Sequence, residues 1–251
     1  MKNRIIFLLF SFLNILSANA EYFRNLSLQN GLSQPSVLSI AQDGLGRMWF
    51  GTQEGINMYD GEQITYVKGN ITNIQGDSLW IGNYISFIVH DDEGNIFFIA
   101  DNNLFGYNIF YSDYKQYTKG NVTTALAACR NEIWYTCNDS LFSYDCQKKQ
   151  LQFVLRLPSH TVNTLTVSDT NIYVGMVDGL CIIPRKSLGL SHFMLSGIDI
   201  YSIFEASNQE VWIGTRMQGL YRLKNDVLQK VPHTPTSNIG IRNPQIGRAH
   251  V

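Results

Sequence analysis

Short runs in which apolar and polar residues alternate recur along this chain, and glycine-containing or polar turns separate them. Alternation with a period of two predicts β-strands that bury one face. The clearest case is a hairpin in which Met48–Thr52 and residues 56–59 form two strands joined by a turn at Gly55. Residues 210–221 repeat this pattern near the other end of the chain. Two copies of a short motif in one chain indicate a repeat architecture.

Large aromatic residues mark five copies of the hairpin, at intervals of 48, 37, 39 and 39 residues: Trp49, Phe97, Trp134, Tyr173 and Trp212. The residues two positions later are Gly51, Ile99, Thr136, Gly175 and Gly214. An alternating segment precedes each aromatic, over residues 37–40, 85–89, 122–128, 162–167 and 201–204. The second strand of each hairpin is predicted over residues 56–59, 104–107, 141–144, 180–183 and 220–223. A weaker fourth strand follows, for example over residues 63–67 and 228–231.

Four short strands in about every 40 residues are typical of a β-propeller blade. One such sheet cannot bury both of its faces, so blades stack around an axis. The sequence predicts an all-β propeller with about five four-stranded blades. Residues 237–242 look like the start of a sixth repeat, so we expect an incomplete ring. We expect the five aromatics to pack between blades, with a role in stacking on a ligand as the alternative.

Two segments depart from the repeat. Residues 23–28 alternate and precede the first repeat, so we predict a strand that would complete the last blade of a closed ring. Without its partner blade in this chain, we expect the strand to be unpaired or mispaired. Residues 70–84 are an insertion, which explains the long first interval. Trp80, within it, either caps the edge of a blade or lies on an exposed loop.

The two ends of the chain carry signals of another kind. Lys2 and Arg4 precede an apolar run over residues 5–16 and a small-residue site, so residues 1–20 are predicted to be a secretory signal peptide cut between Ala20 and Glu21. An uncut membrane anchor is the alternative, although the run is shorter than the roughly 20 residues needed to span. Residues 246–251 resemble a translated sequencing adapter, with a natural tail as the alternative. Residues 21–245 are then one partial propeller domain.

The net charge of −1 and the charged fraction of 16 % favour neither nucleic acid nor a membrane surface as a partner of this region. Cys129, Cys137, Cys146 and Cys181 follow the predicted signal peptide and would meet an oxidising compartment. Their irregular spacing favours buried free thiols, with disulfides as the alternative.

We found no sequence motif for a catalytic site, a cofactor or a metal, and no residue to which a ligand-binding role could be assigned. The histidines at positions 90, 160, 192, 233 and 250 have no partner at ligand spacing. Residues 91–95 are rich in carboxylates but lack the later glutamate of a calcium loop, so we interpret them as a solvated hairpin turn.

The segments 30–33, 37–43, 46–52 and 55–61 together resemble the opening of the two-component regulator propeller family. The resemblance is specific in the first and fifth repeats and weakest in the second, where Phe97 replaces the tryptophan and Ile99 the glycine. It implies the start of a seven-bladed propeller in the periplasmic sensor region of a Bacteroidetes hybrid histidine kinase. It further implies oligosaccharide sensing, a homodimer, a membrane helix and a phosphorelay encoded beyond this region.

Two classes of function follow. The first is a periplasmic sensor whose site is formed by the blade-connecting loops around the axis, which is a prediction taken from the resemblance; a purely partner-binding propeller differs from it only in the ligand. The second is a secreted propeller enzyme, a lyase or a glycosidase acting on polysaccharide. A glycosidase needs two carboxylates about 5 to 10 Å apart across a cleft.

Overall fold

The computed structural model describes residues 25–67, 70–72, 76, 78–118, 123–159 and 161–232 of the 251-residue chain. The predicted signal peptide with its cleavage site at Ala20 and Glu21, the start of a sixth repeat at residues 237–242 and the segment 246–251 lie outside the described residues. The side chain of Trp80 also lies outside this description, so both interpretations of it stay predictions.

Twenty strands of the described chain form five four-stranded antiparallel sheets, which we call blades 1 to 5. Blade 1 contains β1 (Val37–Gln42), β2 (Met48–Thr52), β3 (Gly55–Tyr59) and β4 (Ile64–Val67), and blade 2 contains β7 (Ile85–His90), β8 (Asn95–Ala100), β9 (Asn103–Asn108) and β10 (Asp113–Gln116). Blade 3 contains β11 (Thr123–Cys129), β12 (Glu132–Cys137), β13 (Ser140–Asp145) and β14 (Gln150–Arg156). Blade 4 contains β15 (Val162–Val167), β16 (Asn171–Met176), β17 (Gly179–Pro184) and β18 (His192–Met194). Blade 5 contains β19 (Ile200–Glu205), β20 (Val211–Thr215), β21 (Leu220–Lys224) and β22 (Val227–Lys230).

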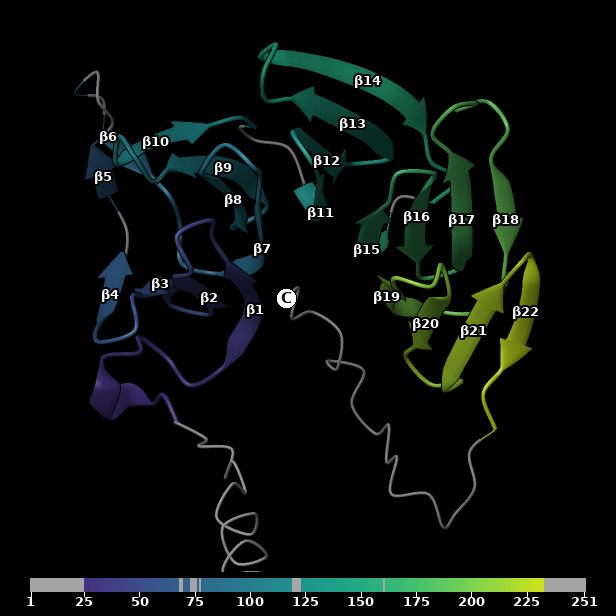
Figure 1. Cartoon of the computed structure of the whole chain (residues 1–251), viewed down its shortest axis with the longest axis horizontal. Coiled ribbons are helices and arrows are strands. Elements are labelled where there is room, and N and C mark those ends of the chain that lie inside the picture. The colour runs from purple at the N-terminus through teal and green to yellow at the C-terminus, as the bar shows by residue number, and fades with distance from the viewer. Residues whose placement is uncertain are drawn as a thin grey trace, which may run out of the picture.

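The blades follow one another around an arc, with β1, β7, β11, β15 and β19 innermost (Figure 1). Successive strands pair with each other within every blade, so each blade is a meander of hairpins. The predicted all-β propeller of five blades is confirmed. Among the described residues, no helix is long and apolar enough to cross a membrane.

Apolar residues of adjacent blades form four core clusters, one between each pair of neighbouring blades. Trp49, Phe97, Trp134 and Tyr173 are buried in these clusters, which confirms their predicted packing role. Trp212 of blade 5 is only half-buried. The reason is that each earlier aromatic packs against the following blade, and no described blade follows blade 5.

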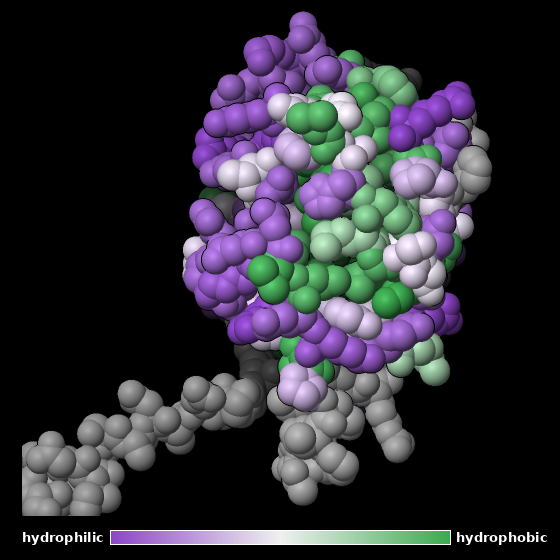
Figure 2. All heavy atoms as spheres, turned by 90° about the vertical axis from the view of Figure 1, so that its right-hand side faces the viewer, coloured by the Kyte–Doolittle hydropathy of each residue, from purple (hydrophilic) through white to green (hydrophobic). Residues whose placement is uncertain are grey.

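The outer strands of blades 4 and 5 form a flank with polar margins and apolar side chains between them (Figure 2). Exposed apolar residues on these strands include Phe193 of β18 and Val227 of β22. An outermost strand packs on only one side, so part of its apolar surface stays in contact with water.

The start of the described chain departs from the prediction. The described part of the predicted strand at residues 23–28 forms no strand, and Leu28–Asn30 is instead a short 3-10 helix, η1. Asn30 Oδ1 accepts a hydrogen bond from the Ser27 amide at 3.0 Å, and Gly31 ends the helix with φ +99°. The described residues of this segment pair with no strand, as expected without the partner blade, but the helical turn at Leu28–Asn30 was not predicted. A strand needs a neighbouring strand with which to pair.

The insertion at residues 70–84 contains a separate two-stranded sheet of β5 (Asn70–Thr72) and β6 (Ser78–Trp80). Ile81, directly after β6, is fully buried in the cluster between blades 1 and 2, so the insertion is anchored by packing.

All four cysteines are free thiols, and Cys137, Cys146 and Cys181 are buried while Cys129 is half-buried. The structure therefore confirms the expectation of mostly buried free thiols over a disulfide framework.

Candidate functional site

In blades 1 and 2, the turn between the first and second strands is organised by a buried carboxylate. In blade 1, Asp43 accepts hydrogen bonds from the Leu45 and Arg47 amides at 2.9 and 3.0 Å, from Arg47 Nε at 2.8 Å and from Trp49 Nε1 at 2.8 Å. Burial of Asp43 opposes its ionisation, but the hydrogen bonds from Trp49, Arg47 and Leu45 outweigh burial and lower its pKa. The repeat tryptophan thus fixes the turn as well as the core.

Asp91 has the same role in blade 2. It accepts from the Glu93 and Asn95 amides at 2.9 and 2.8 Å and from Asn95 Nδ2 at 2.6 Å. The predicted hairpin turn at residues 91–95 is present between β7 and β8, and Asp92 and Glu93 are exposed, as expected of a solvated turn. Asp91 itself is only 3 % exposed, which was not predicted. The turn needs an internal acceptor for its amides, and sequence cannot show that neighbouring strands cover it.

A cavity of about 520 Å³ lies where the inner strands end and these turns begin. Residues from all five blades line it, and one position is equivalent in every inner strand: Ala41, Val89, Ala127, Thr166 and Phe204. Each of these residues is the cross-strand partner of the repeat aromatic of its own blade. The repeat therefore places the cavity wall directly beside the packing aromatic.

Ionisable side chains from four blades surround the cavity, namely His90 and Asp92 of blade 2, Arg130 of blade 3, Asp169 of blade 4 and Glu205 of blade 5. Arg130 Nη2 lies 2.6 Å from Asp169 Oδ2, which links blades 3 and 4 across the rim. Both side chains are largely exposed, so the pair stabilises the fold by no more than about 1 kcal/mol. Glu205 Oε2 is buried and accepts no hydrogen bond from the described residues.

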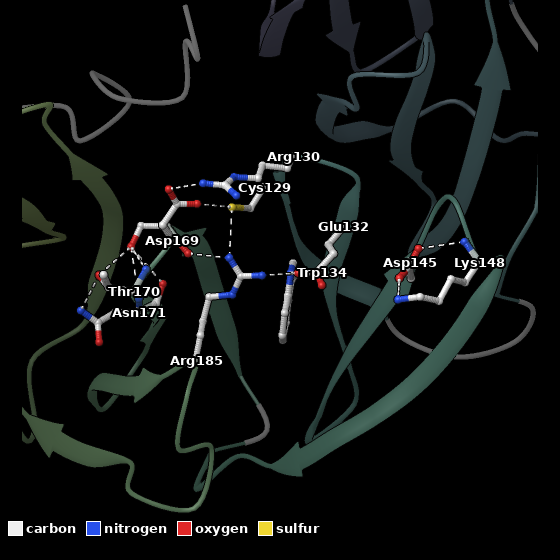
Figure 3. A network of polar contacts seen from close by, with 11 residues as sticks. Cys129, Arg130, Glu132, Trp134, Asp145, Lys148, Asp169, Thr170, Asn171 and Arg185 are labelled. Carbon is white, nitrogen blue, oxygen red and sulfur yellow. Dashed lines mark hydrogen bonds and ion pairs between the residues drawn. The ribbon is translucent and has the colours of Figure 1, made fainter.

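A second link between blades 3 and 4 lies behind this rim (Figure 3). Arg185, which follows β17, forms an ion pair with Glu132 of β12 and lies over the Trp134 ring, with Cζ 5.5 Å from the ring centroid. Its Nη1 also donates to the Ser168 carbonyl at 3.0 Å, and Trp134 Nε1 donates to Glu132 Oε2 at 3.2 Å. One guanidinium thus connects the first turn of blade 4 to the core aromatic of blade 3.

Cys129 belongs to the same network. Arg185 Nη1 donates to its sulfur at 3.4 Å, and the thiol lies 3.9 Å from Asp169 Oδ1. Burial raises the pKa of the Cys129 thiol and outweighs the opposing effect of Arg185. The thiol therefore stays protonated at neutral pH, which makes it a poor nucleophile.

Replacing Arg185 with alanine is expected to lower the free energy of unfolding by about 1–3 kcal/mol, because it breaks a part-buried ion pair and removes a cation from an aromatic face. Chemical denaturation of the purified protein measures the change. Arg156→Ala is the matched control, since Arg156 is 78 % exposed and 3.9 Å from its partner Asp139. Equal losses in the two variants would contradict a specific role for the link between blades.

Sequence reasoning assigned no ligand-binding residue. Four of the five aromatics that it singled out lie in the blade interfaces, and none of the five lines the cavity. Of the five histidines, His90 lines the cavity and His192 lies on the outer strand β18. Those at positions 160, 233 and 250 are outside the described residues. The cavity lies at turns within blades, so a site at the blade-connecting loops stays a prediction. The residues of the cavity wall could have been found from the repeat, because each is the inner-strand residue paired with the aromatic of its blade.

Within the described residues, no group of three or more His, Cys, Asp or Glu side chains is arranged to hold a metal ion.

Comparison with known proteins gives matches at several levels. The family model of the two component regulator propeller matches residues 31–54 and 194–217, which include the first two strands of blades 1 and 5. A curated relative, histidine kinase P4 of Formosa agariphila, is 37 % identical over 75 residues, which are 28 % of this chain and 6 % of that protein.

Among solved structures, the extracellular domain of the hybrid two component system BT3049 of B. thetaiotaomicron superposes with a TM-score of 0.69 at 23 % identity, covering 82 % of this chain and 31 % of that one. PorZ, a surface component of the type-IX secretion system of Porphyromonas gingivalis, has a TM-score of 0.61 at 14 % identity, with 77 % of this chain and 33 % of PorZ covered. Both likenesses show the shared fold. The chain spans a third or less of each relative's length.

The repeats matched by the family model are the two in which the sequence resemblance was most specific. The chain is thus similar to the two component regulator propeller family in its first and fifth repeats, and it shares the fold of the extracellular domain of BT3049.

Proposed function

We propose that this chain is the ligand-sensing propeller of a hybrid two-component system, that it works in the periplasm, and that the central cavity holds the ligand. The observation that carries the proposal is the cavity itself, because residues of all five inner strands line it. A ligand in this place contacts several blades at once. The relatives described as a histidine kinase and as the extracellular domain of a hybrid system support the same assignment.

The proposed ligand is an oligosaccharide. Val89, Val167 and Leu165 give the cavity an apolar wall for the faces of sugar rings, and Ser168, Thr170, Ser207 and Gln209 offer hydroxyl and amide groups to sugar hydroxyls. A few polar groups placed around an apolar surface are typical of small-ligand sites. The rim carboxylates Asp92 and Glu205 add strong acceptors.

Signalling requires a ligand that binds one arrangement of the protein more tightly than another. The pair of Arg130 and Asp169 crosses from blade 3 to blade 4 at the cavity, so a ligand that contacts both residues favours one placement of these blades. In the proposed system this change reaches a kinase through a dimer and a membrane helix encoded outside this region.

The test is a binding screen on the purified periplasmic region, with oligosaccharides released from xylan, arabinan, pectic galactan, mannan and mucin as probes. We expect one class to raise the melting temperature and to bind in calorimetry. Ala128→Trp should fill the cavity and weaken this binding at least tenfold, whereas Thr65→Trp on the exposed outer strand β4 should not. A ligand bound equally by both variants would place the site elsewhere. Release of shorter sugars during incubation would instead favour a polysaccharide-degrading enzyme.

A further inference from the structure

The turn between the third and fourth strands differs sharply between blades. It is polar in blade 1 (Asp60, Gly61, Glu62), in blade 3 (Gln147, Lys148, Lys149) and in blade 5 (Asn225, Asp226), and in blade 4 it is a longer segment with one exposed leucine, Leu190. Blade 2 instead presents two adjacent aromatics, Phe110 and Tyr111, which are 64 % and 74 % exposed. We call these two side chains the aromatic pair.

A chain of buried and half-buried polar groups holds the backbone of the aromatic pair. Asn108 Oδ1 accepts from the Phe110 and Tyr111 amides, both at 3.0 Å. Asn108 Nδ2 donates to Asn95 Oδ1 at 2.8 Å, and Asn95 Nδ2 donates to Asp91 Oδ2 at 2.6 Å. The turn is therefore fixed from the core outward, and its aromatic rings are presented to solvent by a rigid backbone.

The aromatic pair is also continuous with the rim of the central cavity. Asp92 lines the cavity, and two residues later Gly94 lies under the Phe110 ring, where a Cβ would collide with the ring carbons. Gly94 has φ +80°, and its carbonyl accepts a hydrogen bond from the Ile109 amide at 3.0 Å. The two turns of blade 2 thus form one surface that runs from the cavity to the aromatic rings.

The chemistry of this surface fits a sugar better than an apolar partner. Asp92 and Glu93 are both exposed on this turn; Asp92 lines the cavity, and Glu93 directly precedes Gly94, over which the Phe110 ring lies. Aromatic rings stack on the apolar faces of sugar rings, and carboxylates accept from sugar hydroxyls. Because the backbone is fixed beforehand, less conformational entropy is lost when a ligand binds.

We propose that the aromatic pair is a stacking subsite for a saccharide chain that extends from the central cavity across the first turn of blade 2. This inference rests on the proposed function. It adds that the ligand is long enough to occupy both the cavity and the aromatic pair, and that contact with the aromatic pair makes longer chains bind more tightly than short ones.

The experiment compares chain lengths. The periplasmic region is first run in native gels containing xylan, arabinan, pectic galactan, mannan or mucin, and oligosaccharides of two to eight units from the retarding polymer are then titrated by calorimetry. Phe110→Ala and Tyr111→Ala should each weaken binding of the long oligosaccharides by about two- to tenfold, the range expected for one aromatic stacking contact. Disaccharide binding should be unchanged, and Tyr111→Phe should bind as the wild type does.

Phe153→Ala is the matched control, since Phe153 is a similarly exposed aromatic on the outer strand β14. Equal affinities of wild type and aromatic-pair variants for every length would overturn the subsite while leaving the cavity proposal in place. The subsite would also be overturned if light scattering showed a dimer for the wild type and a monomer for the aromatic-pair variants. That result would assign the aromatic pair to contact between copies of the chain. Failure of the wild type to bind any of the five polymers or their oligosaccharides would overturn both proposals.

Discussion

Replacing Gly51 with alanine is expected to lower the free energy of unfolding by about 2–4 kcal/mol, through overpacking between two blades. An added Cβ would lie 2.6 Å from Ser39 Oγ and 2.8 Å from the Ile85 carbonyl oxygen. Ile85 opens the inner strand of blade 2, and its backbone cannot move aside without separating the two sheets. The loss is expected as a lower midpoint of urea denaturation with an unchanged slope.

Gly44→Ala is the matched control, because no atom lies within 4 Å of a Cβ built at Gly44. Its effect should stay within about 1 kcal/mol in either direction. If the two alanine variants were equally stable, close approach of the blades would not be the reason for glycine at position 51.

Replacing Asp43 with alanine is expected to lower the free energy of unfolding by about 3–5 kcal/mol at pH 7, because it leaves the turn amides, the Trp49 indole and the Arg47 guanidinium without their acceptor. Asp43→Asn keeps the shape of the side chain and removes its charge, so it should lower the free energy of unfolding by less than Asp43→Ala does. Chemical denaturation at neutral pH measures both variants. Asp226→Asn, an exposed aspartate on the last hairpin, should change stability by less than about 0.5 kcal/mol.

The Asp43 carboxylate also makes the free energy of unfolding depend on pH. The pKa of Asp43 is lowered in the folded protein, so folding favours its charged form. Its contribution is fully present above the unfolded pKa of about 3.9 and is lost as the pH falls through the lower folded value. Denaturation curves from pH 7 to pH 3 should therefore show the gap between wild type and Asp43→Asn narrowing in acid. A gap that is constant with pH would mean that charge at Asp43 does not stabilise the fold.

The strands of this protein could be predicted from sequence, because every blade is built from hairpins between neighbours in the chain. The period of two, the turn residues and the recurring aromatic are all local signals, and they placed the second strand of each blade at β2, β8, β12, β16 and β20. The recurring glycines at positions 51, 175 and 214 lie in these second strands, and a Cβ at each would collide with atoms of the inner strand opposite.

The candidate site could not be predicted in the same way, because it is formed by residues of different repeats. Val89 and Thr166 hold the repeat position opposite the aromatic, but Arg130, Asp169 and Glu205 follow no common pattern. Only the arrangement of blades around an axis brings these residues to one cavity. Arg185 and Glu132 are 53 residues apart in the chain, and nothing in either repeat indicates their ion pair.

By itself the sequence determined the blades and the packing role of the aromatics, since these follow from short-range periodicity that repeats along the chain. Only the tertiary structure decided that Asp91 is buried, that residues 28–30 form a helical turn, and that Phe110 and Tyr111 lie on one surface with the cavity rim. These three features depend on which segments pack against one another. Such packing is set by contacts between residues that are distant in the chain, and a local sequence pattern does not show it.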